Sequence, residues 1–276
     1  MVERDQEALT RRQLLLGVAG AGALAAGCSG GGSHAATPTT TRNGAPVAPD
    51  GGASTVATTA VGGVAGAGTA GGLAAYVPNG PTTGRSVALT FHGSGEVGLV
   101  QQLLDEAKQE QCPITVFVVG QWLMANPAVG RRMVADGHEL ANHTFTHPTL
   151  SRLGQSAVAT EITGCRDALA HVVGTPGRWF RPSGVEARPS DLILRQSAAA
   201  GYPTVIGFDV DPMDYKDPGA DAVASRAIAG LHAGAIVSLH TGHAGTVAAL
   251  PRIVAAVRSR GLQPVTVSDL VGPARP

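Results

Sequence analysis

The chain has 276 residues, and its 20 lysine and arginine residues are balanced by 20 aspartate and glutamate residues, so the formal net charge is zero. This balance argues against a nucleic-acid-binding protein, because such proteins present a strongly basic surface. The length suffices for one sizeable domain with an appendage. Glycine and alanine are concentrated in the first third of the chain, so the segments are interpreted separately.

The N-terminus has the features of an export signal. Arg11-Arg12 precedes an apolar run, Leu14 to Ala26, that is too short to span a bilayer stably and ends in small residues. The arginine pair is similar to a twin-arginine signal, and the end of the run, Leu24 to Cys28, resembles a bacterial lipoprotein cleavage site. We predict that residues 1–28 are a lipoprotein signal and that a lipid on Cys28 holds the exported chain at the outer face of the cytoplasmic membrane or in the cell wall. The alternative is an ordinary cleaved signal with an incidental cysteine.

Residues 29–84 consist mainly of glycine, alanine, threonine, serine and proline, with almost no large apolar side chains before Leu73 and Tyr76. Such a segment cannot bury enough surface to offset the entropy of ordering. We predict a flexible tether with a root-mean-square span on the order of 40 Å. Such a tether would hold a domain off a membrane so that it reaches cell-wall material, and no protein partner is indicated. The alternative is that residues 29–84 are a low-complexity segment whose length is not under selection.

From Ser86 onward, short apolar runs alternate with amphipathic segments. Strands are predicted at 87–91, 114–119, 139–141, 178–180, 204–208, 235–239 and 264–267. Helices are predicted within 99–107, 157–173, 189–200, 221–231 and 247–260. This alternation predicts a mostly parallel α/β domain over residues 85–272, and the near-continuous apolar strands indicate that helices cover the sheet. A barrel and a doubly wound sheet both fit the pattern.

Two cysteines lie in this domain. Cys112 is expected just before a strand and Cys165 inside a helix. Neither has the spacing of a metal or redox motif, and two separate buried thiols are at least as well supported as a disulfide.

Polar side chains follow five of the predicted strands. They are His92 with Glu96, Asn142 to His147, Arg181, Asp209 to Asp214, and His240 with His243. The carboxyl ends of parallel strands meet at one edge, where α/β barrels and open sheets build their active sites. Five such clusters at one edge favour a catalytic or ligand-binding site.

The most specific indication of chemistry comes from His143 and His147, because two imidazoles four residues apart can bind one cation. His240 is interpreted as a general acid, since imidazole titrates near neutrality, or as a satisfied, partly buried histidine. Arg181 is a permanent cation that can hold a carboxylate in place, and Asp214 is its expected partner. That pair can be a structural salt bridge, a catalytic one, or both.

These motifs resemble the polysaccharide deacetylases of carbohydrate esterase family four, also called the NodB-homology domain. The similar segments are Leu89-Thr90-Phe91, His143-Thr144-Phe145-Thr146-His147, Phe180-Arg181-Pro182, Asp211-Pro212-Met213-Asp214-Tyr215 and Leu239-His240. The resemblance implies a distorted (β/α) barrel of about seven parallel strands. It also implies a divalent metal, with zinc expected, and removal of acetyl groups from a polysaccharide. By the same resemblance His240, Arg181 and Asp214 are catalytic, and Tyr215 and Leu239 line the substrate pocket.

The chain departs from the family pattern where the first motif normally supplies two aspartates, a catalytic base and a metal ligand. His92 and Gly93 stand at those positions. Elsewhere, Ser183 and Gly184 replace a usual proline and aromatic, and Tyr215 replaces a tryptophan.

We expect His92 to join His143 and His147 as the third metal ligand, since catalytic zinc sites generally have three protein ligands and an open water position. If His92 binds the metal, then Glu96, Asp209 or Asp211 accepts the proton of the attacking water, or metal activation alone suffices. If His92 is instead the base, the metal lacks a ligand. Two other readings stay open: a glycan-binding pseudoenzyme, and a different metal-dependent hydrolase on the same barrel.

Overall fold

The computed structural model describes residues 72–272. Its strands are β1 (Ala75–Val77), β2 (Ser86–Gly93), β3 (Thr115–Val118), β4 (Glu139–Asn142), β5 (Thr204–Ile206), β6 (Ile236–His240) and β7 (Gln263–Val265). Its α-helices are α1 (Val97–Gln109), α2 (Gly120–Ala125), α3 (Pro127–Ala135), α4 (Gln155–Val173), α5 (Asp191–Ala199), α6 (Ala220–Gly230), α7 (Ala244–Ser259) and α8 (Val267–Val271). Two 3-10 turns, η1 (Leu150–Arg152) and η2 (Asp214–Lys216), lie in the connections.

Every strand pairing in residues 72–272 is parallel, as predicted. One sheet has the order β4-β3-β2-β6, with β7 also pairing β2, and β1 pairs β5 separately. Isolated parallel bridges connect these pieces: Phe180 bridges Asn142 on one side and Val205 on the other, and Val210 bridges Val237 of β6. Following the bridges from β4 through Phe180 and the 205–210 segment back to β6 closes the ring, which is the distorted barrel that we expected.

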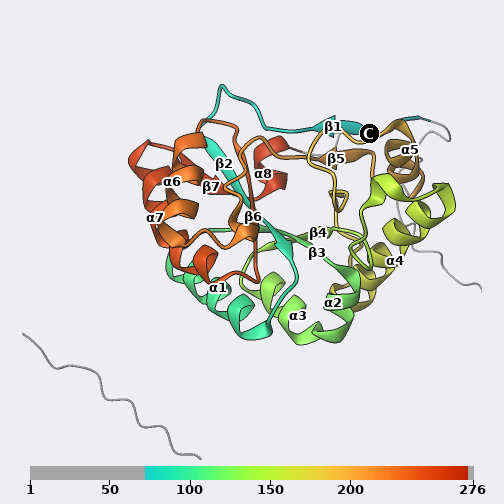
Figure 1. The fold of residues 1–276 in the computed structure, drawn as a ribbon, viewed down its shortest axis with the longest axis horizontal. Coiled ribbons are helices and arrows are strands. Elements are labelled where there is room, and N and C mark those ends of the chain that lie inside the picture. Colours follow the sequence, from blue (N-terminus) through green and yellow to red (C-terminus); the bar gives the residue numbers. More distant parts are fainter. Residues whose placement is uncertain (1–71, 273–276) are drawn as a thin grey trace, which may run out of the picture. The chain divides into compact units, whose positions relative to one another are not determined.

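Helices surround the strands (Figure 1), and nearly every residue of β2 to β6 is buried. The largest core cluster packs outward-facing strand residues such as Leu89, Val116 and Leu239 against α1, α6 and α7. In α1, Val100, Leu103, Leu104 and Ala107 are buried at spacings of three and four residues, and Glu96 caps the first turn by accepting hydrogen bonds from Gly98 N and Leu99 N. This burial explains why the strand sequences read as continuous apolar runs.

Two predicted elements differ most from the structure. The run at 178–180 forms only isolated bridges at Phe180, because it is too short to build a ladder. Strand β1 lies inside the segment predicted as tether, so the boundary at residue 84 was wrong: the folded part already includes Ala75–Val77, which pairs with β5. Three residues between glycine-rich stretches are too few to show a strand period.

The predicted signal, Cys28 and the tether up to residue 71 lie outside the described residues. Within residues 72–272 no helix is long and apolar enough to cross a membrane. Cys112, just before β3, and Cys165, in α4, are both buried free thiols, so the structure has no disulfide between them.

Candidate metal centre and acid-base site

His92 and His240 lie at the carboxyl ends of two neighbouring strands, β2 and β6. β2 and β6 pair in parallel with His92 opposite His240, so both imidazoles lie at the same edge of the barrel. Their ring centroids are 4.4 Å apart, and the ring of His143 lies 4.3 Å from that of His92 on the other side. His92 therefore sits between the predicted metal-binding histidine and the predicted acid.

The loop after β4 carries His143 and His147 in an unusual backbone conformation. Thr144 has φ 71° and His147 has φ 63°, both in the left-handed region that non-glycine residues seldom adopt. Such strain persists only where the surroundings hold it. The amide of Thr144 donates to the side-chain oxygen of Asn142, the last residue of β4.

Two further side chains hold this loop. Glu161 of α4 accepts hydrogen bonds from the amides of Phe145 and Thr146 and from the Thr146 hydroxyl. Ser183 bonds the Thr144 hydroxyl at 3.0 Å and also donates to the carbonyl of Pro148. Position 183, which departs from the family pattern, therefore fixes the loop that presents His143 and His147.

The three predicted ligands are brought together. One nitrogen each from His92, His143 and His147 lies within 4.8 Å of the other two. Nδ1 of His143 is 2.8 Å from the carbonyl oxygen of Arg181, which can only accept, so Nδ1 carries the proton and Nε2 bears the lone pair. That Nε2 is buried and has no hydrogen-bond partner. A buried lone pair facing two other imidazoles fits a divalent cation with nitrogen ligands.

The electrostatics keep this cluster neutral. Burial, followed by the neighbouring His143 and His240, holds the pKa of His92 well below its usual value. Burial and then His147 do the same to the pKa of His143. Neutral imidazoles are the form that binds a metal, so at neutral pH a cation displaces no proton from these two side chains.

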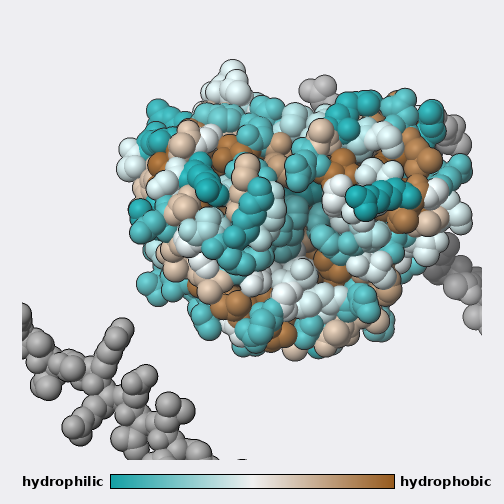
Figure 2. Space-filling model, in the orientation of Figure 1, coloured by the Kyte–Doolittle hydropathy of each residue, from teal (hydrophilic) through white to brown (hydrophobic). Residues whose placement is uncertain are grey.

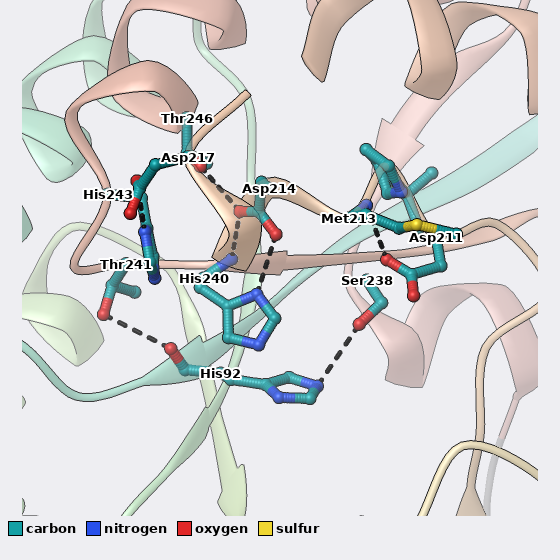
Figure 3. A network of polar contacts seen from close by, with 12 residues as sticks. His92, Asp211, Met213, Asp214, Asp217, Ser238, His240, Thr241, His243 and Thr246 are labelled. Atoms are coloured by element: carbon teal, nitrogen blue, oxygen red, sulfur yellow. Dashed lines mark hydrogen bonds and ion pairs between the residues drawn. The ribbon is translucent and has the colours of Figure 1, made fainter. Parts of the chain in front are cut away.

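His240 has a carboxylate partner. Its Nδ1 lies 2.8 Å from one oxygen of Asp214, and its main-chain amide donates to the other at 2.8 Å (Figure 3). Thr246 donates a third hydrogen bond to the same carboxylate. Burial raises the pKa of Asp214, but the hydrogen bonds from His240 and Thr246 outweigh it and leave the pKa below its ordinary value. The Asp214 carboxylate is thus charged and holds the imidazole in one orientation.

The predicted pairing of Arg181 with Asp214 was wrong. Arg181 points into the barrel, where it donates to the Thr90 hydroxyl and to the carbonyls of Ile206 and Gly207. Its guanidinium lies 4.0 Å from the ring centroid of Phe117. Asp214 is unavailable to it because η2 places that carboxylate against His240. Burial lowers the pKa of Arg181 to about 9. The hydrogen bonds of this side chain connect β2 with the end of β5.

The two predicted pocket residues have different outcomes. Tyr215 is 38% exposed, and its ring centroid lies 5.4 Å from that of His240, so it borders the site. Leu239 is fully buried in the core between barrel and helices, so its assignment to the pocket was wrong. Side chains alternate along a strand, and with His240 at the site it is Ser238 that shares its face. The Ser238 hydroxyl lies 3.3 Å from Nε2 of His92.

Three carboxylates considered as a base are engaged elsewhere. Both oxygens of Glu96 cap α1. Asp209 binds the amide of Ile236, at the opposite end of β6 from His240, and His232. Asp211 accepts from the amide of Met213. Within residues 72–272 the group of close metal-ligand atoms contains histidines only.

A second histidine-carboxylate pair was not predicted. Nδ1 of His243 lies 2.7 Å from Asp217, and the His243 ring centroid is 5.8 Å from that of His240 (Figure 3). This pair spans the same two segments as His240 and Asp214. In the sequence, the two aspartates are three residues apart, and so are the two histidines. This equal spacing indicates two pairs only when η2 is known to lie beside the end of β6.

The outer surface around these elements is largely hydrophilic (Figure 2). Near its middle the surface is hollowed between the side built from α6 and α7 and the side built from α4 and α5 (Figures 1 and 2). Apolar residues are scattered over this face and form no single broad patch there.

Comparisons with known proteins show the family that this chain resembles. The family profile described as polysaccharide deacetylase matches residues 79–205. A chitooligosaccharide deacetylase of Sinorhizobium fredii is 34% identical over 207 residues, covering 67% of this chain and 91% of that protein. A peptidoglycan-N-acetylglucosamine deacetylase of Bacillus cereus is 29% identical over 195 residues, covering 69% and 90%.

Solved structures give the same picture. A family 4 carbohydrate esterase from Streptomyces lividans, solved with acetate, superposes with a TM-score of 0.62 and 32% identity, covering 69% of this chain and 96% of that one. A Bacillus anthracis protein described as a family 4 pseudoenzyme shares the fold, with a TM-score of 0.67 and 23% identity over 71% of this chain and 68% of its own.

Proposed function

This chain belongs to the polysaccharide deacetylase family, carbohydrate esterase family four, and from that premise we propose that it is a metal-dependent hydrolase that removes acetyl groups from a cell-envelope or extracellular polysaccharide. The observation that carries the proposal is the buried, unpartnered Nε2 of His143 beside His92 and His147, next to a histidine held by Asp214. A ligand set and an acid-base pair side by side are what acetyl hydrolysis requires.

His92, His143 and His147 would hold the cation, and zinc suits three imidazole ligands. When bound, a divalent metal supplies Lewis-acid activation of a water molecule and of the acetyl carbonyl. His240 would donate a proton to the leaving nitrogen or oxygen, and the metal-activated water would release its own proton to solvent, since no carboxylate of residues 72–272 joins the histidine cluster. The proton from His240 would come from Nε2, because Nδ1 is held by Asp214. Tyr215 lies beside His240 as a wall for the sugar.

The substrate and the location belong to the same proposal. The relatives named above act, by their names, on chitooligosaccharides and on the N-acetylglucosamine of peptidoglycan. An N-acetyl amide on a glucosamine-type polymer is therefore our first choice, with an O-acetyl ester as the other. The lipoprotein signal and tether predicted from the sequence would place the domain outside the cytoplasmic membrane, where such a glycan is found.

The test is acetate release from N-acetylglucosamine oligomers by the zinc-loaded full chain, compared with a chelator-treated sample and with His240→Ala. We expect release that depends on zinc and falls by about 100-fold or more in the variant, as for loss of a general acid. Release that persists unchanged in His240→Ala would overturn the assigned role. No release from any acetylated polymer would overturn the enzyme assignment.

The role of His92 has a test of its own. If it is the third ligand, His92→Ala retains only two imidazole ligands, and we expect zinc occupancy to fall well below one ion per chain. His171→Ala, at an exposed position of α4, is the matched control and should keep full occupancy. Unchanged zinc content in His92→Ala would contradict the assignment.

A second candidate function is a pseudoenzyme that binds a glycan without cleaving it. It is favoured by one observation: in residues 72–272 no carboxylate joins the histidine cluster, and the three candidate bases are held by other contacts. Retention of the His240–Asp214 pair is the observation against it, because binding alone does not need a held acid. Glycan affinity without acetate release would establish this alternative.

A further inference from the structure

We infer that Ser238 is a positioning residue of the metal centre, whose hydroxyl holds Nε2 of His92 and so presents Nδ1 of His92 to the cation. The inference rests on the proposed function for the existence of that centre. It assigns a role to a residue that no motif indicated, and it specifies which nitrogen of His92 is used.

The first step is the geometry. Ser238 lies in β6, is 2% exposed, and has its Oγ 3.3 Å from Nε2 of His92 (Figure 3). Among the described residues this is the one hydrogen bond of the Ser238 side chain. Thr90, the register partner of Ser238 on β2, does not compete for it. The Thr90 hydroxyl donates to the carbonyl of Val237 and accepts from Arg181.

The second step is the count of protons and lone pairs. A neutral imidazole has one N–H and one lone pair, and a metal ligand must use the lone pair. In His143, Nδ1–H is given to the Arg181 carbonyl, which leaves Nε2 for the metal. In His92 the inferred arrangement is the reverse: Nε2 faces the Ser238 hydroxyl, which can accept as well as donate, and with Nε2–H given to Oγ the lone pair stays on Nδ1.

The third step is the consequence. The second nitrogen of a ligating histidine usually has a hydrogen-bond partner that fixes its tautomer and ring orientation, and loss of such a partner weakens metal affinity by about 10- to 100-fold. Ser238 is buried, and within residues 72–272 its hydroxyl makes the hydrogen bond to the His92 ring, so it is that partner for His92. Ser238 also explains how a histidine placed where the family has an aspartate can be oriented as a ligand.

The experiment measures the zinc dissociation constant of the full chain by competition with a chromophoric chelator. We expect Ser238→Ala to bind zinc about 10-fold more weakly. Ser238→Thr keeps the hydroxyl and should bind close to wild type. Ser197→Ala removes an equally buried hydroxyl, bonded to Ile193 in α5, and should be unchanged. Thermal unfolding of the metal-free variants separates a folding defect from a loss of affinity.

A spectroscopic readout complements the affinity. In long-range ¹⁵N–¹H correlation spectra of the zinc-loaded wild type, with His92→Ala for assignment, the His92 ring proton should lie on Nε2. A proton on Nδ1, or Ser238→Ala affinity equal to wild type, would overturn the inference while leaving the metal centre intact. A wild-type chain that binds no zinc would overturn both this inference and the proposed metal centre.

Discussion

Asp214 accepts hydrogen bonds from the imidazole of His240, from its main-chain amide and from the hydroxyl of Thr246. These contacts, more than the residue type, determine what the carboxylate can do: it serves the acid and is unavailable to Arg181. The same holds for Glu96, whose two oxygens are occupied at the start of α1. At the scale of single residues, the function of a polar side chain depends on which hydrogen-bond partners occupy it.

Replacing Asp214 by asparagine tests that role. The amide retains the shape, but its NH2 group cannot accept, so one of the two hydrogen bonds from His240 is lost and the ring is held less well. We expect acetate release to fall by about 100-fold or more, in the range for a disabled general acid. Zinc content should not change, because Asp214 is not in the ligand cluster. Asp217→Asn, at the exposed partner of His243, is the control. Equal losses in both variants would contradict a specific role for Asp214.

The loop between β4 and η1 is the element on which the site depends. Its left-handed residues are Thr144 and His147. Asn142 and Ser183 bond to Thr144, and Glu161 binds the backbone between the two left-handed residues. None of these three belongs to the histidine cluster of residues 72–272. These contacts matter because a mobile ligand residue must be ordered when the metal binds, and the cost of ordering it weakens the metal affinity.

Glu161→Ala tests the loop. Two amides and a hydroxyl lose their acceptor, so the strained conformation is less well populated and zinc should bind about 10-fold more weakly. The measurement is the same chelator competition, with Glu186→Ala at an exposed position as the control. An unchanged zinc affinity in Glu161→Ala would show that the loop holds its shape without this carboxylate.

Much of the architecture could be predicted at the level of elements, since long buried runs and helical spacing are strong local signals. Helices α4 to α7 and strands β2 to β7 lie where they were expected. Short elements such as β1, α2 and α3 were missed because their stability comes from tertiary contacts. Leu239 was misassigned because the sequence does not show which face of β6 points inward, and Ser238 was missed for the same reason.

At the scale of the whole molecule, stability and metal binding are linked through buried imidazoles. Burial lowers the pKa of His143 well below its usual value, so the folded chain keeps this ring neutral while the unfolded chain protonates it below pH about 6.5. The stabilisation that comes from keeping His143 neutral is fully present above pH about 6.5 and is lost as the pH falls below it. The pKa values of His92, His147 and His138 are lowered in the same direction.

We therefore expect the free energy of unfolding of the metal-free chain to decrease as the pH falls from about 7.5 to about 5.5. His143→Asn should show a shallower decrease, by an amount on the order of 1 kcal/mol, because one neutral buried imidazole is gone. Urea unfolding at several pH values measures the slopes, and His171→Asn should follow the wild type. Parallel curves for His143→Asn and wild type would contradict the account.

The central claim is a metal centre made of three histidines, with His92 where the family has an aspartate. The most direct measurement is anomalous diffraction at the zinc edge from crystals of the zinc-loaded chain. The account predicts one strong peak bounded by ring nitrogens of His92, His143 and His147, with Nδ1 of His92 as its ligand atom. A peak held by His143, His147 and a carboxylate with His92 turned away, or no peak at these residues, would contradict it.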